Sequence, residues 1–397
     1  MDAEEDKTHA GSVIPRTGRR VAFDYLRATA IVLVVYHHAI IPYTTFAYLN
    51  PLNPVQTISP VVNGERWSGF DTFAWFNDIF LMSLLFLVSG LFVWKSLTRK
   101  GAAKYLSARV TRLGIPFLVG VLLLVAPTYY PAQLQISQGF GGDIGFVQFY
   151  LELFRVGFGT AGPLWFVWVL LAFNGLFVAA YKLLPIPARP DGTLVTSALA
   201  RPVLFFATLL AISAAAYGMM VIMFGPLTWI GVGPFKVQAS RSLHYLVYFL
   251  AGVAVGAYGI DRSVFRADGP LATYWWAWLS AAVVAFLVAV RVTDIASSSP
   301  FIGGTMFTIC CVTIGAAFIA TFLRFANRRR VVLDSLSDNS FGIYIVHYLI
   351  AAWLQYFLLG PEVSPFVKAS LAFVGTLVLS WAVTAALRRI PAVARVI

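Results

Sequence analysis

The sequence predicts an all-α integral membrane protein with about ten transmembrane helices. Of the 397 residues, 59% are apolar and 12% are charged, and the mean hydropathy is +0.79. A soluble chain, by comparison, is about one quarter charged. Ten stretches are long and apolar enough to cross a hydrocarbon layer about 30 Å thick. They cover residues 22–43, 73–94, 113–130, 163–182, 203–224, 242–260, 271–291, 304–324, 340–359 and 367–387.

The two ends of the chain lie outside these stretches. The first twenty residues are charged and polar and contain no apolar run of the signal-peptide type. We therefore expect residues 1–20 to be a disordered cytosolic tail, residues 21–390 one transmembrane domain, and residues 391–397 a short cytosolic tail. With the N-terminus inside, 22 of the 29 lysines and arginines lie on the cytosolic side and six on the other. The positive-inside rule then places both termini in the cytosol.

The net charge of +12 follows from this topology and favours contact with anionic membrane lipid. The basic residues are dispersed among the membrane segments, so the charge does not indicate nucleic-acid binding. The two cysteines, Cys310 and Cys311, are adjacent in the eighth stretch, a spacing that gives neither a disulfide framework nor a metal site. We expect them to be packing residues and expect no bound metal.

The first stretch carries the most informative pair, Arg27 and His38, which are eleven residues apart. At about 100° per residue, eleven steps return to within roughly 20° of the start, about 16 Å further along the axis. Both side chains therefore lie on one face of one helix, and Asp24 shares that face. Ionisable groups are costly inside a bilayer and indicate function by default. The pair suggests an anion held at one end and proton chemistry at the other. His37 points about 80° away from this face and is the weaker catalytic candidate.

The second and third stretches meet at a basic cytosolic turn. Ser89 and Gly90, near the inner end of the second stretch, are candidates for cofactor binding, although a small-residue packing contact explains them equally well. Arg109 and Arg112 lie one helical turn apart where the chain re-enters the membrane. Arginines so placed suit bidentate phosphate binding. The alternative is a pair of positive-inside anchors.

Two later stretches carry further candidates for a pore or substrate site. Trp165, at the outer end of the fourth stretch, is explained either by such a site or by an aromatic belt. His347 lies about two turns inside the ninth stretch, with Ser340 and Tyr344 on related faces. A single histidine on such a helix is usually a packing residue, but one paired with His38 across a pore has a functional role.

Five motifs in this order resemble those of membrane acyltransferase family 3. An acidic-x-x-Arg turn followed by ten residues and a histidine corresponds to Asp24, Arg27 and His38. The other four are F-x-x-S-G at Phe86–Gly90, R-x-x-R-x-x-x-P at Arg109, Arg112 and Pro116, L-W-F at Leu164–Phe166, and S-x-x-x-Y-x-x-H at Ser340, Tyr344 and His347. The similarity covers nearly the whole chain. His37 is an extra histidine beside the motif histidine.

The resemblance implies a membrane O-acyltransferase of the bacterial cytoplasmic (inner) membrane. Its co-substrate would be cytosolic acyl-CoA, acetyl-CoA or succinyl-CoA, with the phosphates held by Arg27, Arg109 and Arg112. His38 would act as general base or as acyl carrier, and Asp24 would orient Arg27. The acceptor would be a hydroxyl of a periplasmic or cell-surface glycan. The aromatic outer loops at 44–72 and 131–162 suit sugar stacking, and the motifs look most like those of the subset that modifies periplasmic glucans.

The rival prediction is a secondary transporter that exports an anionic metabolite. Ten spans, buried ionisable groups and a basic inner mouth also suit that function. Transporters often contain inverted repeats and paired broken helices, and the sequence shows neither. A purely structural membrane subunit would not need a buried arginine and histidine. The sequence does not predict the oligomeric state.

Overall fold

The computed structural model describes residues 18–185, 192–293 and 299–397, and these residues are helical over most of their length. All ten predicted stretches are helical. Nine correspond to single helices: α1 (Gly18–Ile40), α2 (Ser68–Gly90), α8 (Trp165–Leu183), α10 (Pro202–Phe224), α11 (Ala239–Tyr258), α13 (Trp275–Arg291), α15 (Pro300–Phe325), α16 (Val331–Phe357) and α17 (Pro365–Leu387). The remaining one, the third stretch at 113–130, lies in a run of shorter helical pieces. They are α4 (Ala102–Arg109), the π-helical turn η3 (Val110–Gly114), α5 (Ile115–Leu123) and α6 (Val125–Phe140).

Short elements connect these helices. They are η1 (Ile41–Tyr43), η2 (Pro54–Gln56), α3 (Val93–Lys100), α7 (Phe146–Arg155), η4 (Gly162–Leu164), α9 (Thr193–Ala200), α12 (Pro270–Thr273) and α18 (Pro391–Ala394). Strands β1 (Trp229–Val232) and β2 (Phe235–Gln238) form an antiparallel hairpin in which Trp229 is paired with Gln238. The loop expected at 131–162 thus consists largely of α6 and α7. Residues 1–17 of the expected N-terminal tail lie outside the described residues.

Within the described part of the chain, eight helical segments are long and apolar enough to span a membrane. Two of the ten predicted spans are not among them. The helix α13 has only 17 residues, and α11 carries Arg241 and His244 in its first turns, which lowers its hydropathy. Both are nevertheless packed into the same bundle, where α11 contacts α2 and α10, and α13 contacts α15. The chain is therefore an all-helical membrane protein, as the sequence predicts.

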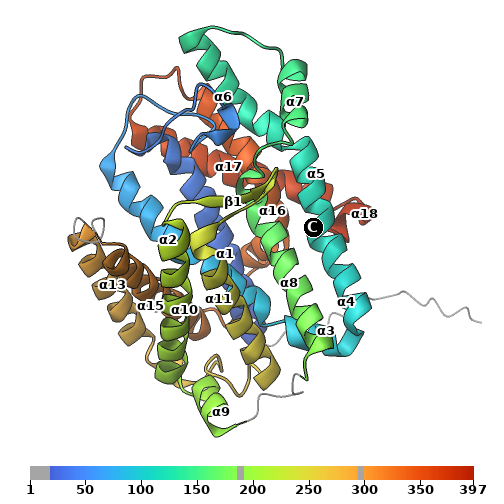
Figure 1. The fold of residues 1–397 in the computed structure, drawn as a ribbon, viewed down its shortest axis with the longest axis vertical. Helices are drawn as coiled ribbons and strands as arrows, with labels where there is room; N and C mark the ends of the chain where they lie inside the picture. The colour runs from blue at the N-terminus through green and yellow to red at the C-terminus, as the bar shows by residue number, and fades with distance from the viewer. Residues whose placement is uncertain (1–17, 186–191, 294–298) are drawn as a thin grey trace, which may run out of the picture.

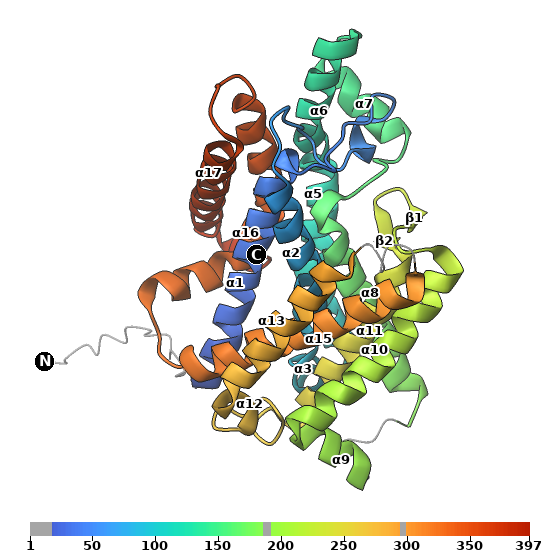
Figure 2. The same ribbon diagram turned by 90° about the vertical axis from the view of Figure 1, so that its left-hand side faces the viewer.

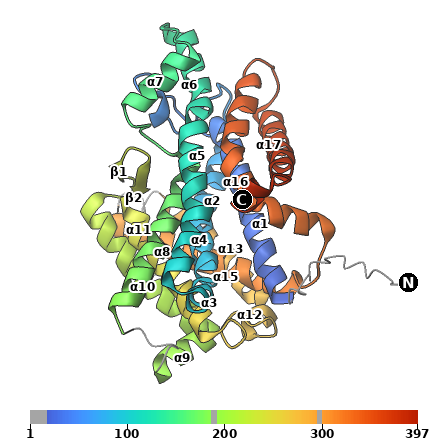
Figure 3. The ribbon, with the colours of Figure 1, turned by 90° about the vertical axis from the view of Figure 1, so that its right-hand side faces the viewer.

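Helix α1 lies in the middle of the bundle in two perpendicular views (Figures 1 and 2). It contacts α2, α15, α16 and α17. Figure 3 shows α17 on one side of it and α10 on the other. The short helices α6 and α7 lie at the end where α1 finishes, and α9 and α12 lie at the opposite end (Figure 2). The central position of α1 brings the residues of its two ends into contact with several helices.

Glycines permit the close approach of α2 and α11. A Cβ at Gly252 would overlap the carbonyl oxygen of Leu87, and one at Gly256 would overlap that of Leu91. Gly90 faces the same contact, because a Cβ there would overlap the carbonyl oxygen of Phe249. Small residues at helix interfaces in membranes allow this backbone-to-backbone packing. This contact accounts for Gly90 without a bound ligand.

Candidate active site

The centre of the site is a pair of histidines from α1 and α16. His347 Nε2 lies 3.2 Å from His38 Nδ1, although the two residues are 309 positions apart in the chain. His347 Nδ1 is 2.7 Å from the carbonyl oxygen of Tyr344, and His38 Nδ1 is 2.9 Å from that of Val34. His347 is fully buried. The sequence left open whether His347 is a packing residue or a partner of His38, and the structure places the two rings in contact.

These contacts determine which ring nitrogen carries the proton. A backbone carbonyl accepts a hydrogen bond and cannot donate one, so His347 Nδ1 must be the donor to Tyr344. In a neutral imidazole the other nitrogen is then an acceptor, and His347 Nε2 accepts from His38 Nδ1–H. His38 therefore presents the unprotonated Nε2, whose lone pair is free to accept a proton or to attack a carbonyl carbon.

Neighbouring side chains hold His38 in place. Gln355 is almost fully buried and donates from Nε2 to the carbonyl oxygens of His38 and Ala39, at 2.8 and 3.3 Å. The rings of Tyr348 and His38 have centroids 4.7 Å apart. The Tyr344 hydroxyl donates to the carbonyl oxygen of Pro163, which ties α16 to η4. The end of α1 is thus fixed against α16 by several polar contacts.

Two cavities adjoin the histidines. The smaller has a volume of about 100 Å³ and is lined by side chains from α1, α2, α8 and α16, including Trp165 and Tyr344. The larger has a volume of about 310 Å³ and is lined by Trp75, Tyr348 and two residues of the loop after α1, Phe46 and Ile58. His37, His38 and Asp78 line both cavities. Because Phe46 and Ile58 are exposed, the larger cavity opens at the end of the bundle where α1 finishes.

An ion pair between Asp78 and Arg241 forms part of this site, and sequence reasoning missed it. Arg241 donates from Nη1 and Nη2 to the two carboxylate oxygens of Asp78, at 2.7 and 2.5 Å. The Arg241 side chain is 10% exposed and that of Asp78 is 44% exposed, at the cavity wall. The Arg241 guanidinium also lies 4.9 Å from the ring centroid of Phe307. The signal was available, since Asp78 is an acidic residue inside the predicted second span.

We expect Asp78→Ala to destabilise the protein, because it leaves Arg241 as a buried charge without its partner. Breaking a fully buried ion pair typically costs about 3–5 kcal/mol, and the loss should be smaller here because the Asp78 side chain is 44% exposed. The measurement is the thermal unfolding midpoint of the purified protein in detergent. The double variant Asp78→Leu with Arg241→Met serves as the control, because it removes both charges and should recover most of the loss. Equal destabilisation by the single and double variants would contradict this account.

Four arginines gather around the N-terminal half of α1, away from the end that carries His38. Arg27 Nη2 lies 3.7 Å from Asp24 Oδ1, as the shared helix face predicts. The charges of Arg27, Arg109 and Arg388 all lie close enough to act on Arg112. The three arginines predicted from the sequence are therefore brought together, from α1, α4 and η3. Arg388, which directly follows α17, joins them and was not predicted as a site residue.

Polar contacts orient two of these arginines. Arg109 Nε donates to the Tyr105 hydroxyl at 3.1 Å, and its guanidinium lies 5.0 Å from the Tyr105 ring centroid. The Tyr105 hydroxyl in turn donates to the side-chain oxygen of the buried Asn174. Arg388 Nη1 donates to the carbonyl oxygen of Asp338 and lies 3.4 Å from Asn339 Oδ1. Arg27 and Arg112 remain exposed. This end can bind a polyanion through several guanidinium groups.

Of the other residues predicted from the sequence, one lines a histidine cavity and two lie outside both cavities. Trp165 lines the smaller cavity and stacks on Tyr245 with ring centroids 5.6 Å apart, so it is part of the site rather than only of an aromatic belt. Ser340 is buried, and its hydroxyl donates to the carbonyl oxygen of Ser337 at 2.8 Å within α16. Ser89 is half-buried beside the packing glycine Gly90. Ser340 and Ser89 are not among the residues that line the two histidine cavities.

Over residues 18–185, 192–293 and 299–397, no group of three or more His, Cys, Asp and Glu side chains is arranged to hold a metal ion. The two cysteines are buried, and Cys311 Sγ lies 3.5 Å from His244 Nε2 in the interior. His244 Nε2 also lies 3.1 Å from the Ser83 hydroxyl. These contacts belong to the packed interior between α2, α11 and α15.

We expect His37→Ala to reduce turnover less than tenfold, which is much less than the same change at His38. His37 lines both cavities, but no described side chain or carbonyl pairs with its buried Nδ1. Its ring hydrogen-bonds the backbone of Ala74 instead, so the nitrogen left without a partner is the buried Nδ1. The measurement is the catalytic rate of the two variants at equal protein concentration. A larger loss in His37→Ala than in His38→Ala would identify His37 as the reacting histidine.

The chain was compared with known structures, curated proteins and protein families. No solved structure matches it. It is 23% identical over 281 residues to glucans biosynthesis protein C of Escherichia coli O1:K1 / APEC, covering 69% of this chain and 70% of that protein. It is 25% identical over 194 residues to the protein of the same name from Escherichia coli O139:H28 (strain E24377A / ETEC), covering 48% and 49%.

The profile of the family described as "Acyltransferase domain" matches residues 20–385, which is nearly the whole chain. This range contains the histidine pair, the two cavities and three of the four clustered arginines, all but Arg388. The fold, the site and this match agree, and the chain belongs to acyltransferase family 3 and is a membrane acyltransferase.

Proposed function

We propose that this protein transfers an acetyl or succinyl group from cytosolic acyl-CoA to a glycan hydroxyl, with His38 as general base. The observation that carries the proposal is the His38 Nε2 lone pair beside two cavities, with four arginines gathered around Arg27, eleven residues earlier on the same helix. The N-terminus and C-terminus would lie in the cytosol of a bacterium, and the protein in its cytoplasmic membrane. The arginines would then face the acyl-CoA pool.

The arginine cluster supports a donor that carries several phosphates. CoA has a pyrophosphate and a 3′-phosphate, and guanidinium groups bind phosphate oxygens in a bidentate manner. Arg27 and Arg112 are exposed and available to a ligand, while Tyr105 and Asn339 hold Arg109 and Arg388 in position. Gathering four like charges is unfavourable without an anion, and a bound polyphosphate relieves that repulsion. The long, thin pantetheine arm would run beside α1 toward His38, about 16 Å along the helix axis.

The chemistry requires one proton transfer and one acyl transfer. His38 Nε2 takes the proton from the acceptor hydroxyl as the hydroxyl oxygen attacks the thioester carbonyl carbon. The carbon–sulfur bond then breaks, and the leaving CoA thiolate takes the proton from the His38 imidazolium, which restores the neutral imidazole. The carbonyl oxygen of Val34 and His347 Nε2 continue to accept from Nδ1–H and stabilise the imidazolium. General-base catalysis of this kind typically contributes about 10²–10⁴-fold.

The same lone pair serves the second route that the sequence leaves open, in which His38 carries the acyl group itself. Rapid mixing with acyl-CoA in the absence of acceptor distinguishes the routes, because only a covalent route releases CoA in a burst that is stoichiometric with the protein. Direct transfer predicts no acyl adduct, whereas a covalent route predicts one that forms with the donor alone and disappears when acceptor is added.

The larger cavity is the best candidate for the site that binds the acceptor. It has a volume of about 310 Å³, opens away from the arginines, and carries the aromatic side chains Phe46, Trp75 and Tyr348. Aromatic rings with a few polar groups suit the faces of sugar rings. The relatives named glucans biosynthesis protein C favour a glucan as the glycan.

The test is CoA release by the purified protein in nanodiscs. Acetyl-CoA and succinyl-CoA are offered separately, each with and without a glucan oligosaccharide. Release that depends on the glucan, with acylated sugar as the second product, would support the proposal. If the protein instead moves an anionic metabolite across proteoliposomes and releases no CoA, the transporter alternative would replace it.

A further inference from the structure

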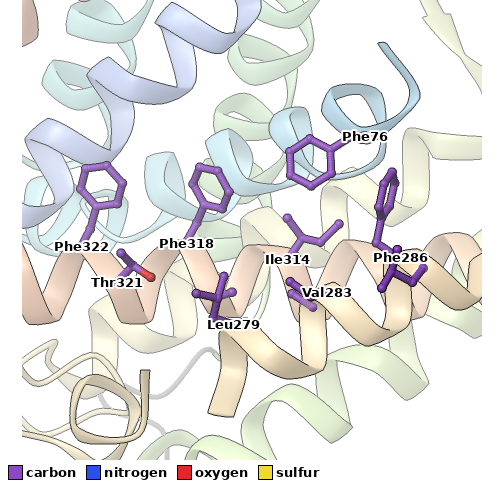
Figure 4. A pocket seen from close by; sticks show the side chains of 11 residues that line it. Phe76, Leu279, Val283, Phe286, Ile314, Phe318, Thr321 and Phe322 are labelled. Atoms are coloured by element: carbon purple, nitrogen blue, oxygen red, sulfur yellow. The ribbon is translucent and has the colours of Figure 1, made fainter. Parts of the chain in front are cut away.

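A second pair of cavities lies away from the histidines. The first is a groove of about 350 Å³ between α2, α13 and α15. Figure 4 shows its side chains in a row, from Phe286 at one end to Phe322 and Thr321 at the other, with Phe76 of α2 facing α15. Thr321 is the single polar residue among those that line it. The groove is therefore suited to a hydrocarbon chain and not to a polar substrate.

The open edge of this groove lies on the outer surface of the bundle. Leu279, Val283 and Leu287 of α13 line the groove and are 43%, 50% and 57% exposed. Figure 1 shows α13 and α15 at the periphery, on the opposite side from α4 and α5. In a membrane, this surface contacts the acyl chains of lipids, since apolar helix faces of this length lie in the hydrocarbon region.

A basic cavity of about 350 Å³ adjoins one end of the groove. Thr321 and Phe322 line both, so the two cavities are neighbours along α15. The remaining lining includes Asn327, Arg328 and Arg330 from the loop after α15. This is the end of the bundle at which α1 begins, because Tyr25 and Thr29 of α1 also line the cavity.

Local contacts leave positive charge in this cavity. Asp334 pairs with Arg329 at 3.6 Å and accepts a hydrogen bond from the Tyr25 hydroxyl at 3.0 Å. The backbone N–H of Arg330 donates to the same hydroxyl at 2.8 Å, which fixes the loop. Among the described residues, no ion pair engages the side chains of Arg328 and Arg330. Both are exposed and available to an anion.

We infer that this composite site binds one anionic phospholipid. One acyl chain occupies the groove along α13 and α15, and the phosphate of the headgroup contacts Arg328 and Arg330. The lipid would lie in the membrane leaflet at the end of the bundle where α1 begins. Basic residues at a membrane surface attract anionic headgroups. The adjacency of the apolar groove and the basic cavity favours a lipid over a free phosphate, which would use only the arginines. The inference does not depend on the acyl-transfer reaction.

The test is native mass spectrometry of the delipidated protein with equal concentrations of phosphatidylglycerol and phosphatidylethanolamine. We expect the wild type to retain the anionic lipid preferentially. The double variant Arg328→Gln with Arg330→Gln should reduce this preference by roughly 30-fold. Each arginine near a membrane surface contributes about 1 kcal/mol to the binding of anionic lipid, and two such contributions correspond to that factor. The control Arg201→Gln with Arg262→Gln removes the same charge from exposed positions elsewhere and should retain it.

A second pair of variants tests the groove. Leu279→Trp fills it, whereas Val284→Trp places the same side chain at an exposed position of α13 that does not line it. We expect only Leu279→Trp to reduce binding of phosphatidylglycerol, and we expect soluble glycerol phosphate not to displace the lipid. Equal retention of both lipids by the wild type, or displacement by glycerol phosphate alone, would overturn the inference. So would unchanged binding in both the arginine and the Leu279 variants.

Discussion

His38→Ala should abolish acyl transfer while the protein still inserts and folds. The substitution removes the Nε2 lone pair that the contacts of Nδ1 with Val34 and His347 leave free. Loss of a general base typically lowers the rate by about 10²–10⁴-fold. The measurement is the rate of glucan-dependent CoA release, with saturating acceptor and both acyl donors, for the wild type and the variant.

Two controls separate chemistry from structure in this experiment. Gel filtration and the thermal unfolding midpoint should show that His38→Ala remains folded. His347→Gln keeps a side-chain oxygen or nitrogen near His38, while the carbonyl oxygen of Val34 still accepts from Nδ1–H, so this variant should retain measurable activity. Full activity in folded His38→Ala would eliminate the proposed mechanism.

Arg27→Ala should raise the KM for acyl-CoA and leave the KM for the glucan unchanged. Arg27 is exposed and lies with Arg109, Arg112 and Arg388 at the end of α1 remote from the larger cavity. A hydrogen bond to a charged group is worth about 1.5–3 kcal/mol, which corresponds to roughly 10–150-fold in binding. The measurement is the dependence of the rate on each substrate in turn.

The matched variants for this test are Arg27→Lys and Arg388→Gln. Lysine retains the charge but loses the bidentate geometry, so Arg27→Lys should show an intermediate KM. Arg388→Gln should also raise the KM for acyl-CoA if the fourth arginine binds the same donor. A defect confined to the glucan would contradict the assignment of this end to the donor.

The sequence predicted the helices more completely than it predicted their contacts. All ten stretches are helical, because an apolar run long enough to cross hydrocarbon must satisfy its backbone hydrogen bonds internally. The third stretch was placed at 113–130, whereas the helical chain runs from α4 through α6 and contains a π-helical turn at Val110–Gly114. Hydropathy does not report such a change in helix winding.

The site residues show the same difference between what the helix period predicts and what depends on helix packing. The spacing of Asp24, Arg27 and His38 follows from the helix period alone, and Asp24 and Arg27 do form an ion pair. Trp165 and Tyr344 were candidates, and they line the cavity beside His38. The sequence marks Asp78 as an acidic residue inside a span, but its pairing could not be predicted, because its partner Arg241 is 163 residues away on another helix.

The sequence by itself determined that this protein is a helical membrane protein with an arginine and a histidine on one face of its first helix. Only the tertiary structure decided that His38 meets His347, that Asp78 pairs with Arg241, and that Arg388 joins the arginine cluster. The physical reason is that the period of a helix fixes the direction of each side chain about its own axis. The residue that it meets depends on how the helices pack, and that packing depends on small residues, such as Gly90 and Gly252, distributed over distant parts of the chain.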